Sequence, residues 1–128
     1  MKIVSTIARY LLGLIFLVFG LNLFFHFLPM GPMPTGPAGQ FFGALMVSHY
    51  IQIVAVFQVV PGILLLINRY VPLGLALLAP VIVNIDLTHI LMAPSGLPLA
   101  ALVTILWFLA AWRVRSVFFP LLQQKVAD

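Results

Sequence analysis

Four long apolar runs separated by short polar gaps dominate the chain. Over 19 residues, the first run would extend about 28 Å as a helix, close to the roughly 30 Å hydrocarbon core of a bilayer. The sequence therefore predicts an all-α fold, a four-transmembrane-helix bundle that forms one membrane domain over residues 1–128. The predicted spans and tail lie at about residues 10–28, 41–67, 73–92, 97–112 and 113–128.

Proline and glycine punctuate these runs. The gap at 29–40 is rich in both, which predicts an extended cap without regular helix. Pro61-Gly62 in the second run and Pro80 in the third predict local kinks that packed neighbours can tolerate. Gly13 and Gly20 lie seven residues apart and predict a face on which another helix packs closely.

The basic residues are sorted by alternate gaps. Residues 29–40 and 93–98 carry no charge. The remaining gap, at 68–72, and the two ends of the chain hold all six basic side chains: Lys2, Arg9, Arg69, Arg113, Arg115 and Lys125. Loops rich in Lys and Arg stay on the cytoplasmic side of a membrane. The pattern predicts cytoplasmic N and C termini in a multi-pass membrane protein.

Composition agrees with a lipid environment. Hydrophobic residues make up 64% of the chain and charged residues 6%, against about 25% charged in ordinary soluble domains. The net charge of +4 comes from few residues that flank apolar runs, so anionic head groups of the lipid bilayer explain it better than nucleic acid. With no cysteine, disulfides and thiolate nucleophiles are excluded.

Polar side chains gather near the predicted outer ends of three spans. Burial of polar groups at membrane depth is costly, so they are candidates for ligand binding. Because successive spans alternate in direction, we expect these side chains to meet in one outer layer. The candidates are Asn22, His26, His49, Gln52, Asn84, Asp86 and His89.

Several interpretations of this layer stay open. Polar side chains can act as hydrogen-bonding glue between helices, and Asp86 with His89 can be a solvated pair near the interface. A histidine oriented by a carboxylate can also hold a quinone headgroup, haem or pigment. The spacing matches no metal motif, and we assign neither a metal site nor a catalytic residue. Ser48 and His49 are adjacent in sequence, which places them on different helix faces.

Three segments of the chain carry a family resemblance. They read RYLLGLIFLVFGLN at residues 9–22, VVPGILLLINRYVPL at 59–73 and LAPVIVN at 78–84, followed by His89. These segments resemble DoxX-like membrane proteins. The resemblance implies a four-helix, multi-pass protein of the bacterial cytoplasmic (inner) membrane. The founding members of the family are linked to a thiosulfate:quinone oxidoreductase. Such proteins commonly carry a glutamate where this chain has Gln58, so a role that needs a titrating carboxylate there is not carried over.

The leading functional prediction is an accessory or structural subunit of a larger membrane redox or energy-converting complex, not catalytic alone, with other membrane-protein subunits as partners. One alternative is a quinone-linked oxidoreductase component whose site is the outer polar layer. A further alternative is a pigment- or haem-binding subunit that uses one of the histidines.

Overall fold

The computed structural model describes residues 1–29 and 31–126, and this part of the chain contains helices and no strand. Four segments are long and apolar enough to cross a membrane: α1, α3, α4, and α5 with the η1 turn before it. The predictions of an all-α fold and of four spans are confirmed at this level. The elements are α1 (Lys2–Phe25), α2 (Gly36–Val47), α3 (Tyr50–Ile67), α4 (Val71–Leu91), η1 (Pro94–Gly96), α5 (Leu97–Trp112), α6 (Arg115–Phe118) and η2 (Phe119–Leu122).

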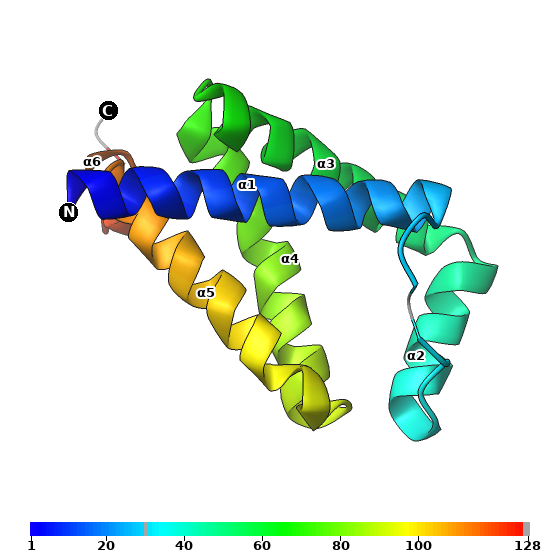
Figure 1. Ribbon diagram of the computed structural model, residues 1–128. Helices are drawn as coiled ribbons and strands as arrows, with labels where there is room; N and C mark the ends of the chain where they lie inside the picture. The colour runs from blue at the N-terminus through cyan, green and yellow to red at the C-terminus, as the bar shows by residue number, and fades with distance from the viewer. Residues whose placement is uncertain (30, 127–128) are drawn as a thin grey trace.

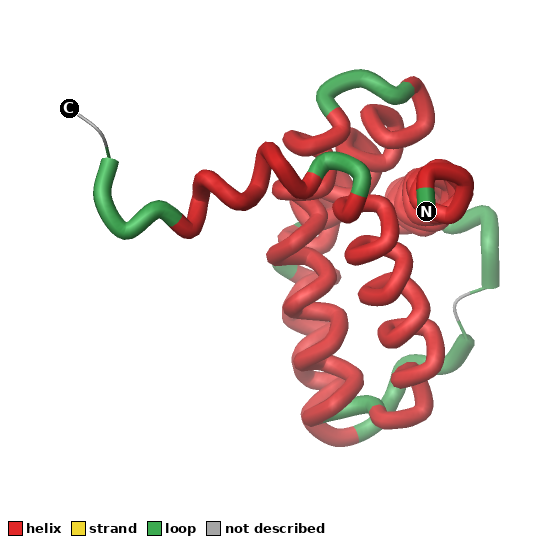
Figure 2. Tube along the Cα trace, turned by 90° about the vertical axis from the view of Figure 1, so that its left-hand side faces the viewer, coloured by secondary structure: helices red, strands yellow, loops and turns green. Residues whose placement is uncertain are grey.

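The spans form two antiparallel pairs that cross. Helices α1 and α3 lie side by side, and the hairpin of α4 and α5 crosses them at a large angle (Figure 1). Turned by 90°, the view runs nearly along α1, and the hairpin extends away from it (Figure 2). Helix α1 contacts α3 and α5, and α3 contacts α4.

Glycines allow α1 and α3 to approach closely. A Cβ added at Gly13 would lie 3.0 Å from the carbonyl oxygen of Gly62, and one added at Gly62 would lie 2.9 Å from the backbone nitrogen of Leu17. At Gly20 the nearest atom, on Val59, would be 2.8 Å away. The predicted close-packing face of α1 is confirmed, and Pro61-Gly62 sits at the contact inside a helix that continues through it.

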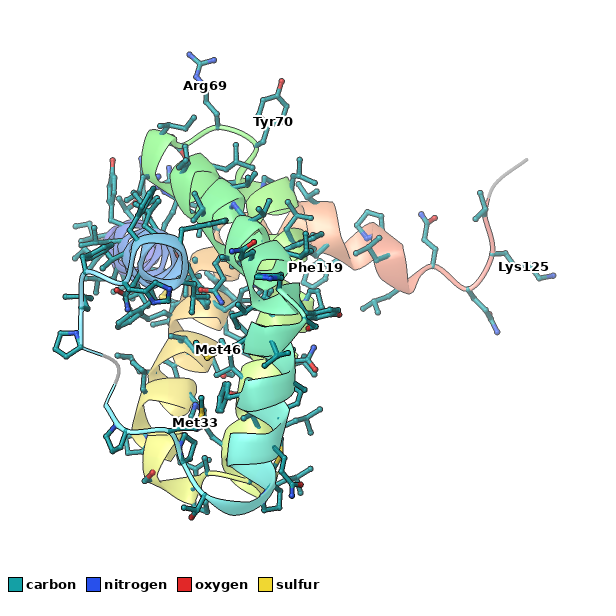
Figure 3. The ribbon with its side chains drawn as sticks, turned by 90° about the vertical axis from the view of Figure 1, so that its right-hand side faces the viewer. Met33, Met46, Arg69, Tyr70, Phe119 and Lys125 are labelled. Atoms are coloured by element: carbon teal, nitrogen blue, oxygen red, sulfur yellow. The ribbon has the colours of Figure 1, made fainter. Side chains whose placement is uncertain are left out.

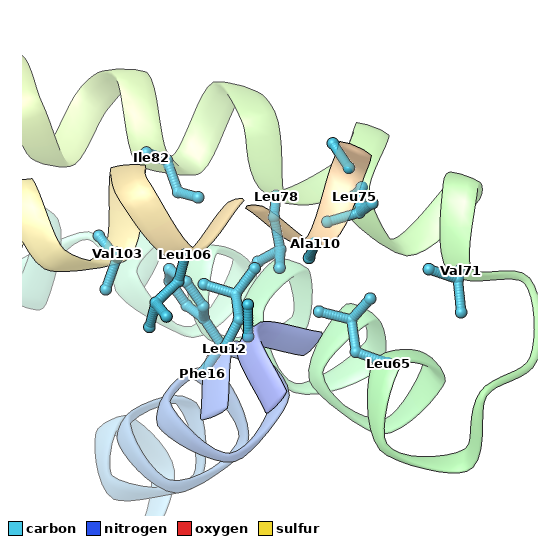
Figure 4. Close-up of a cluster of buried hydrophobic side chains, with 12 residues drawn as sticks. Leu12, Phe16, Leu65, Val71, Leu75, Leu78, Ile82, Val103, Leu106 and Ala110 are labelled. Carbon is cyan, nitrogen blue, oxygen red and sulfur yellow. The ribbon is translucent and has the colours of Figure 1, made fainter. Parts of the chain in front are cut away.

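The hydrophobic core lies where the two pairs cross. Side chains from all four spans meet there, so each helix buries one stripe and leaves the rest to the surroundings (Figure 4). The central members are Leu12, Phe16, Leu65, Leu75, Leu78, Val103 and Leu106. The indole nitrogen of Trp107 also donates to the carbonyl oxygen of Leu75 at 2.8 Å, which ties α5 to α4.

The run predicted as one span at 41–67 is divided into α2 and α3. The Ser48 hydroxyl donates to the carbonyl oxygen of Ala44 at 2.7 Å, and His49 adopts a left-handed conformation with φ 63°. Serine side chains compete with helical backbone bonds in this way. Helix α2 also begins at Gly36, inside the predicted loop, because Pro37 stands in its first turn, where proline is tolerated.

The tail beyond residue 113 projects from the helices. Its short helical pieces α6 and η2 lead to Lys125 (Figure 3), and the predicted tail residues 127–128 lie outside the described part. Phe118 packs its ring 6.0 Å from that of Trp107, whereas Phe119 and Leu122 are exposed. The tail thus presents apolar side chains, which is typical of a segment that lies on a membrane surface.

Candidate functional site

The predicted outer layer is divided into two places. The C-terminal end of α1 and the start of α3 lie together, whereas the C-terminal end of α4 lies at the far tip of the crossing hairpin (Figures 1 and 2). The first place holds Asn22, His26, His49 and Gln52. The second holds Asn84, Asp86 and His89. The expected convergence of three helix ends depends on nearly parallel spans, and the crossing of the two pairs prevents it.

At the first place, Asn22 ends a helix. Its side chain is buried, and its Oδ1 accepts the backbone N–H of Leu28 at 2.7 Å. Its carbonyl oxygen accepts the N–H of His26, which has a left-handed conformation with φ 53°. This geometry satisfies groups that the helix end leaves unpaired. Asn22 therefore shapes the end of α1.

The remaining residues of the first place are exposed. His26 and His49 occupy the left-handed positions that flank α1 and α3, and Gln52 lies in the first turn of α3. Left-handed positions are uncommon for residues other than glycine. The two histidines are thus held by backbone turns, with their side chains at the surface.

At the second place, Asp86 has a partner on the neighbouring helix. The Thr104 hydroxyl lies 2.8 Å from Oδ2 and 3.0 Å from Oδ1 of Asp86, and donates to this carboxylate from α5. Thr104 is a site residue that the sequence argument missed. The feature of the sequence that could have indicated Thr104 is that it carries the single hydroxyl in the fourth apolar run. It lies seven residues after the start of α5 at Leu97.

The pair borders a groove between α4 and α5. The groove has a volume of about 330 Å³. Its other walls are apolar: Ile90, Leu97, Ala100, Ala101 and Ile105. A mostly apolar groove with one acceptor and one hydroxyl suits a lipid-soluble molecule with a polar head.

His89 closes the tip of the same hairpin. Its Nδ1 lies 3.1 Å from the carbonyl oxygen of Ala93, and its ring packs directly against Gly96. A Cβ at Gly96 would lie 2.2 Å from two ring atoms of His89, so the close approach requires glycine. This contact makes His89 part of the α4–α5 turn.

Asn84 lies on the exposed surface of α4. Its Nδ2 donates to the carbonyl oxygen of Pro80 at 2.8 Å, one turn earlier in the same helix. A second back-bond follows, from the Thr88 hydroxyl to the carbonyl oxygen of Asn84 at 2.7 Å. The amide itself contacts the surroundings of the protein.

Among the described residues, no group of three or more His, Asp, Glu or Cys side chains comes together as a metal site. Comparison with known proteins finds no family model, no curated protein and no solved structure that matches the chain. The resemblance to DoxX-like proteins stays a prediction. Of the predicted candidates, Asp86 gains a side-chain partner on a neighbouring helix, Thr104, beside the groove.

Proposed function

We propose that this chain is a small, non-catalytic subunit of a larger membrane assembly, of the DoxX-like type, in the bacterial cytoplasmic membrane. Its redox or energy-converting partners would supply the cofactors. Both termini are cytoplasmic in this proposal. The sorting of basic residues supports that orientation, because Arg9 of α1 and Arg113 beyond α5 line one cavity at the same end of the molecule.

The exposed amide of Asn84 carries the proposal. It lies about 10 Å from the C-terminal end of α4, at 1.5 Å per residue, and thus inside a span. The bond to Pro80 uses one of the four hydrogen-bonding positions of the amide. Hydrocarbon offers no partner for the others, whereas a polar group on a neighbouring helix does.

Site-specific cross-linking tests the assembly. A photo-reactive amino acid is placed at position 84 of the full chain, and the protein is expressed at its natural level in the membrane. It should give a cross-linked protein adduct of one defined mass. The matched control is position 73, because Leu73 is also exposed on α4 but is apolar and lies near the other end. The same partner should remain bound during purification in mild detergent. A chain that is purely monomeric, with no adduct at 84, would exclude the proposal.

A second candidate function is a quinone-linked oxidoreductase component, and the groove beside Asp86 favours it. The Thr104 hydroxyl donates to Asp86, so its one hydrogen is already used, and the carboxylate oxygens remain as acceptors. A quinol hydroxyl can donate to Asp86, whereas a quinone carbonyl cannot. The reduced form should therefore bind more tightly than the oxidised form.

Binding measurements with the purified protein test this candidate. Asp86→Asn should weaken quinol binding about tenfold, the loss expected for one hydrogen bond to a charged group. Asn84→Ala is the matched control, because Asn84 lies on the same helix and does not border the groove. If both variants bind quinol as the parent does, the groove is not a quinol site.

A further inference from the structure

A second cavity lies at the basic end of the molecule. Its volume is about 140 Å³, far above the roughly 10–15 Å³ that one water needs. Polar lining residues come from α1, from the turn between α3 and α4, and from the residue after α5. They are Ser5, Thr6, Arg9, Asn68 and Arg113. Asn68 and Arg113 are exposed, so the cavity reaches the surface.

Ser5 has a buried hydroxyl without a partner. Its side chain is 2% exposed, and its Oγ makes no hydrogen bond within the protein. Serine in a helix usually bonds to the preceding turn or faces solvent. A buried polar atom left unpaired is costly and often marks an ion or ligand that completes the site. Ser5 is one of the residues that line the cavity, which makes an occupant of the cavity a candidate partner for its hydroxyl.

Two guanidinium groups supply positive charge. Arg9 donates to the carbonyl oxygen of Leu65, an otherwise orphan group in the last turn of α3. Arg113 donates to the Thr6 hydroxyl at 3.1 Å. Each guanidinium carries five N–H donors, so both retain donors beyond these bonds. Among the described residues that line the cavity, none is acidic.

We propose that this cavity binds a phosphate group, with Arg9 and Arg113 supplying charge and Ser5 a hydroxyl donor. Arginine matches phosphate oxygens with paired N–H bonds. The phosphate could belong to a phospholipid headgroup or be free in solution. The proposed cytoplasmic orientation places the cavity beside the anionic leaflet. The cavity lies at the opposite end of α4 from Asp86 and does not include Asn84, so the site is separate from both candidate sites above. Only the placement beside the anionic leaflet rests on the proposed orientation.

Two binding experiments on the full chain in a maltoside detergent test the site. One arm titrates inorganic phosphate by calorimetry, and the other titrates phosphatidylglycerol by native mass spectrometry. Arg113→Gln should weaken binding about tenfold. The matched control is Arg115→Gln, which removes the same charge outside the cavity, from a guanidinium 4.3 Å over the Trp112 ring. The control should change binding less than about twofold.

Ser5→Ala separates binding from folding. It removes a hydroxyl that has no partner in the protein, so the melting temperature without ligand should stay equal or rise, while binding weakens severalfold. Saturable binding of phosphatidylglycerol alone, or of inorganic phosphate alone, would identify the source of the group. No saturable binding in either arm, or equal losses in Arg113→Gln and Arg115→Gln, would overturn the proposal. Unchanged binding by Ser5→Ala would also overturn it, even if Arg113→Gln did not fold.

Discussion

The Thr104 hydroxyl donates to the Asp86 carboxylate, with oxygen–oxygen distances of 2.8 and 3.0 Å, and so joins α5 to α4. The same hydroxyl lies 2.9 Å from the carbonyl oxygen of Ala100. One hydroxyl has one hydrogen, and the bond to the charged group is the stronger of the two. Nearer the other end, Trp107 donates to Leu75. Two hydrogen bonds, at different heights along the hairpin, therefore connect α4 and α5.

Removing the first of these links should destabilise the protein. Thr104→Val keeps the shape and leaves the carboxylate without its donor, so we expect the free energy of unfolding in mixed micelles to fall by about 1.5–3 kcal/mol. Thr88→Val is the control, because its hydroxyl bonds only to its own helix at Asn84 and its loss should be nearly neutral. Equal costs for both variants would contradict an interhelical role for Thr104.

Close packing of α1 on α3 gives a second prediction. Gly62→Ala places a methyl group 2.9 Å from the backbone of Leu17, which cannot move as a side chain can. The unfolding free energy should fall by about 1–3 kcal/mol. Gly43→Ala is the control in α2, where an added Cβ meets nothing within 4 Å and helix propensity favours alanine by up to about 1 kcal/mol. A stable Gly62→Ala protein would mean that the helices separate at no cost.

His89 and Gly96 should be energetically coupled. Gly96→Ala alone drives a methyl group into the His89 ring and should cost about 1–3 kcal/mol. In a His89→Ala background the ring is gone, so the same change should be nearly neutral. A double-mutant cycle on unfolding free energies measures this coupling. Additive effects would show that the ring and the turn do not depend on each other.

The orientation proposal predicts a labelling pattern. The chain has no cysteine, so single Ser→Cys changes give unique probes. Ser95 in η1 and Ser116 in α6 are both exposed and lie on opposite sides of the membrane if the termini are cytoplasmic. A membrane-impermeant maleimide should label Ser95→Cys in intact cells and Ser116→Cys only after permeabilisation. Labelling of Ser116→Cys in intact cells, with Ser95→Cys labelled only after permeabilisation, would place the termini outside.

Local features of the fold followed from sequence, and features that depend on distant partners did not. The apolar runs predicted four spans, and the spacing of Gly13 and Gly20 predicted the packing face of α1. The break at Ser48–His49 was missed because the apolar run continues through it, and one side-chain bond to Ala44 with one left-handed residue divides it. Hydropathy averages over a window and cannot detect such a stop.

The candidate site depended on helix crossing. Spacing along α4 placed Asp86 and His89 near one end, but their partners are Thr104 and Gly96, contributed by α5 and the turn before it. The expected layer joined α4 to the ends of α1 and α3. A sequence pattern gives the position of a side chain along the axis of its own helix. The angle at which the helices pack decides which neighbouring helix that side chain faces.

The amino-acid sequence by itself determined that the chain forms long apolar helices and that its basic residues gather at alternate helix ends. These properties are local, because hydrophobicity and charge act residue by residue on transfer into lipid. The tertiary structure decided how the two helix pairs cross. The crossing places Arg9 and Arg113 in the lining of one cavity, and it brings Thr104 to Asp86. The crossing angle depends on how the surfaces of two helices pack together, and no single stretch of sequence contains both surfaces.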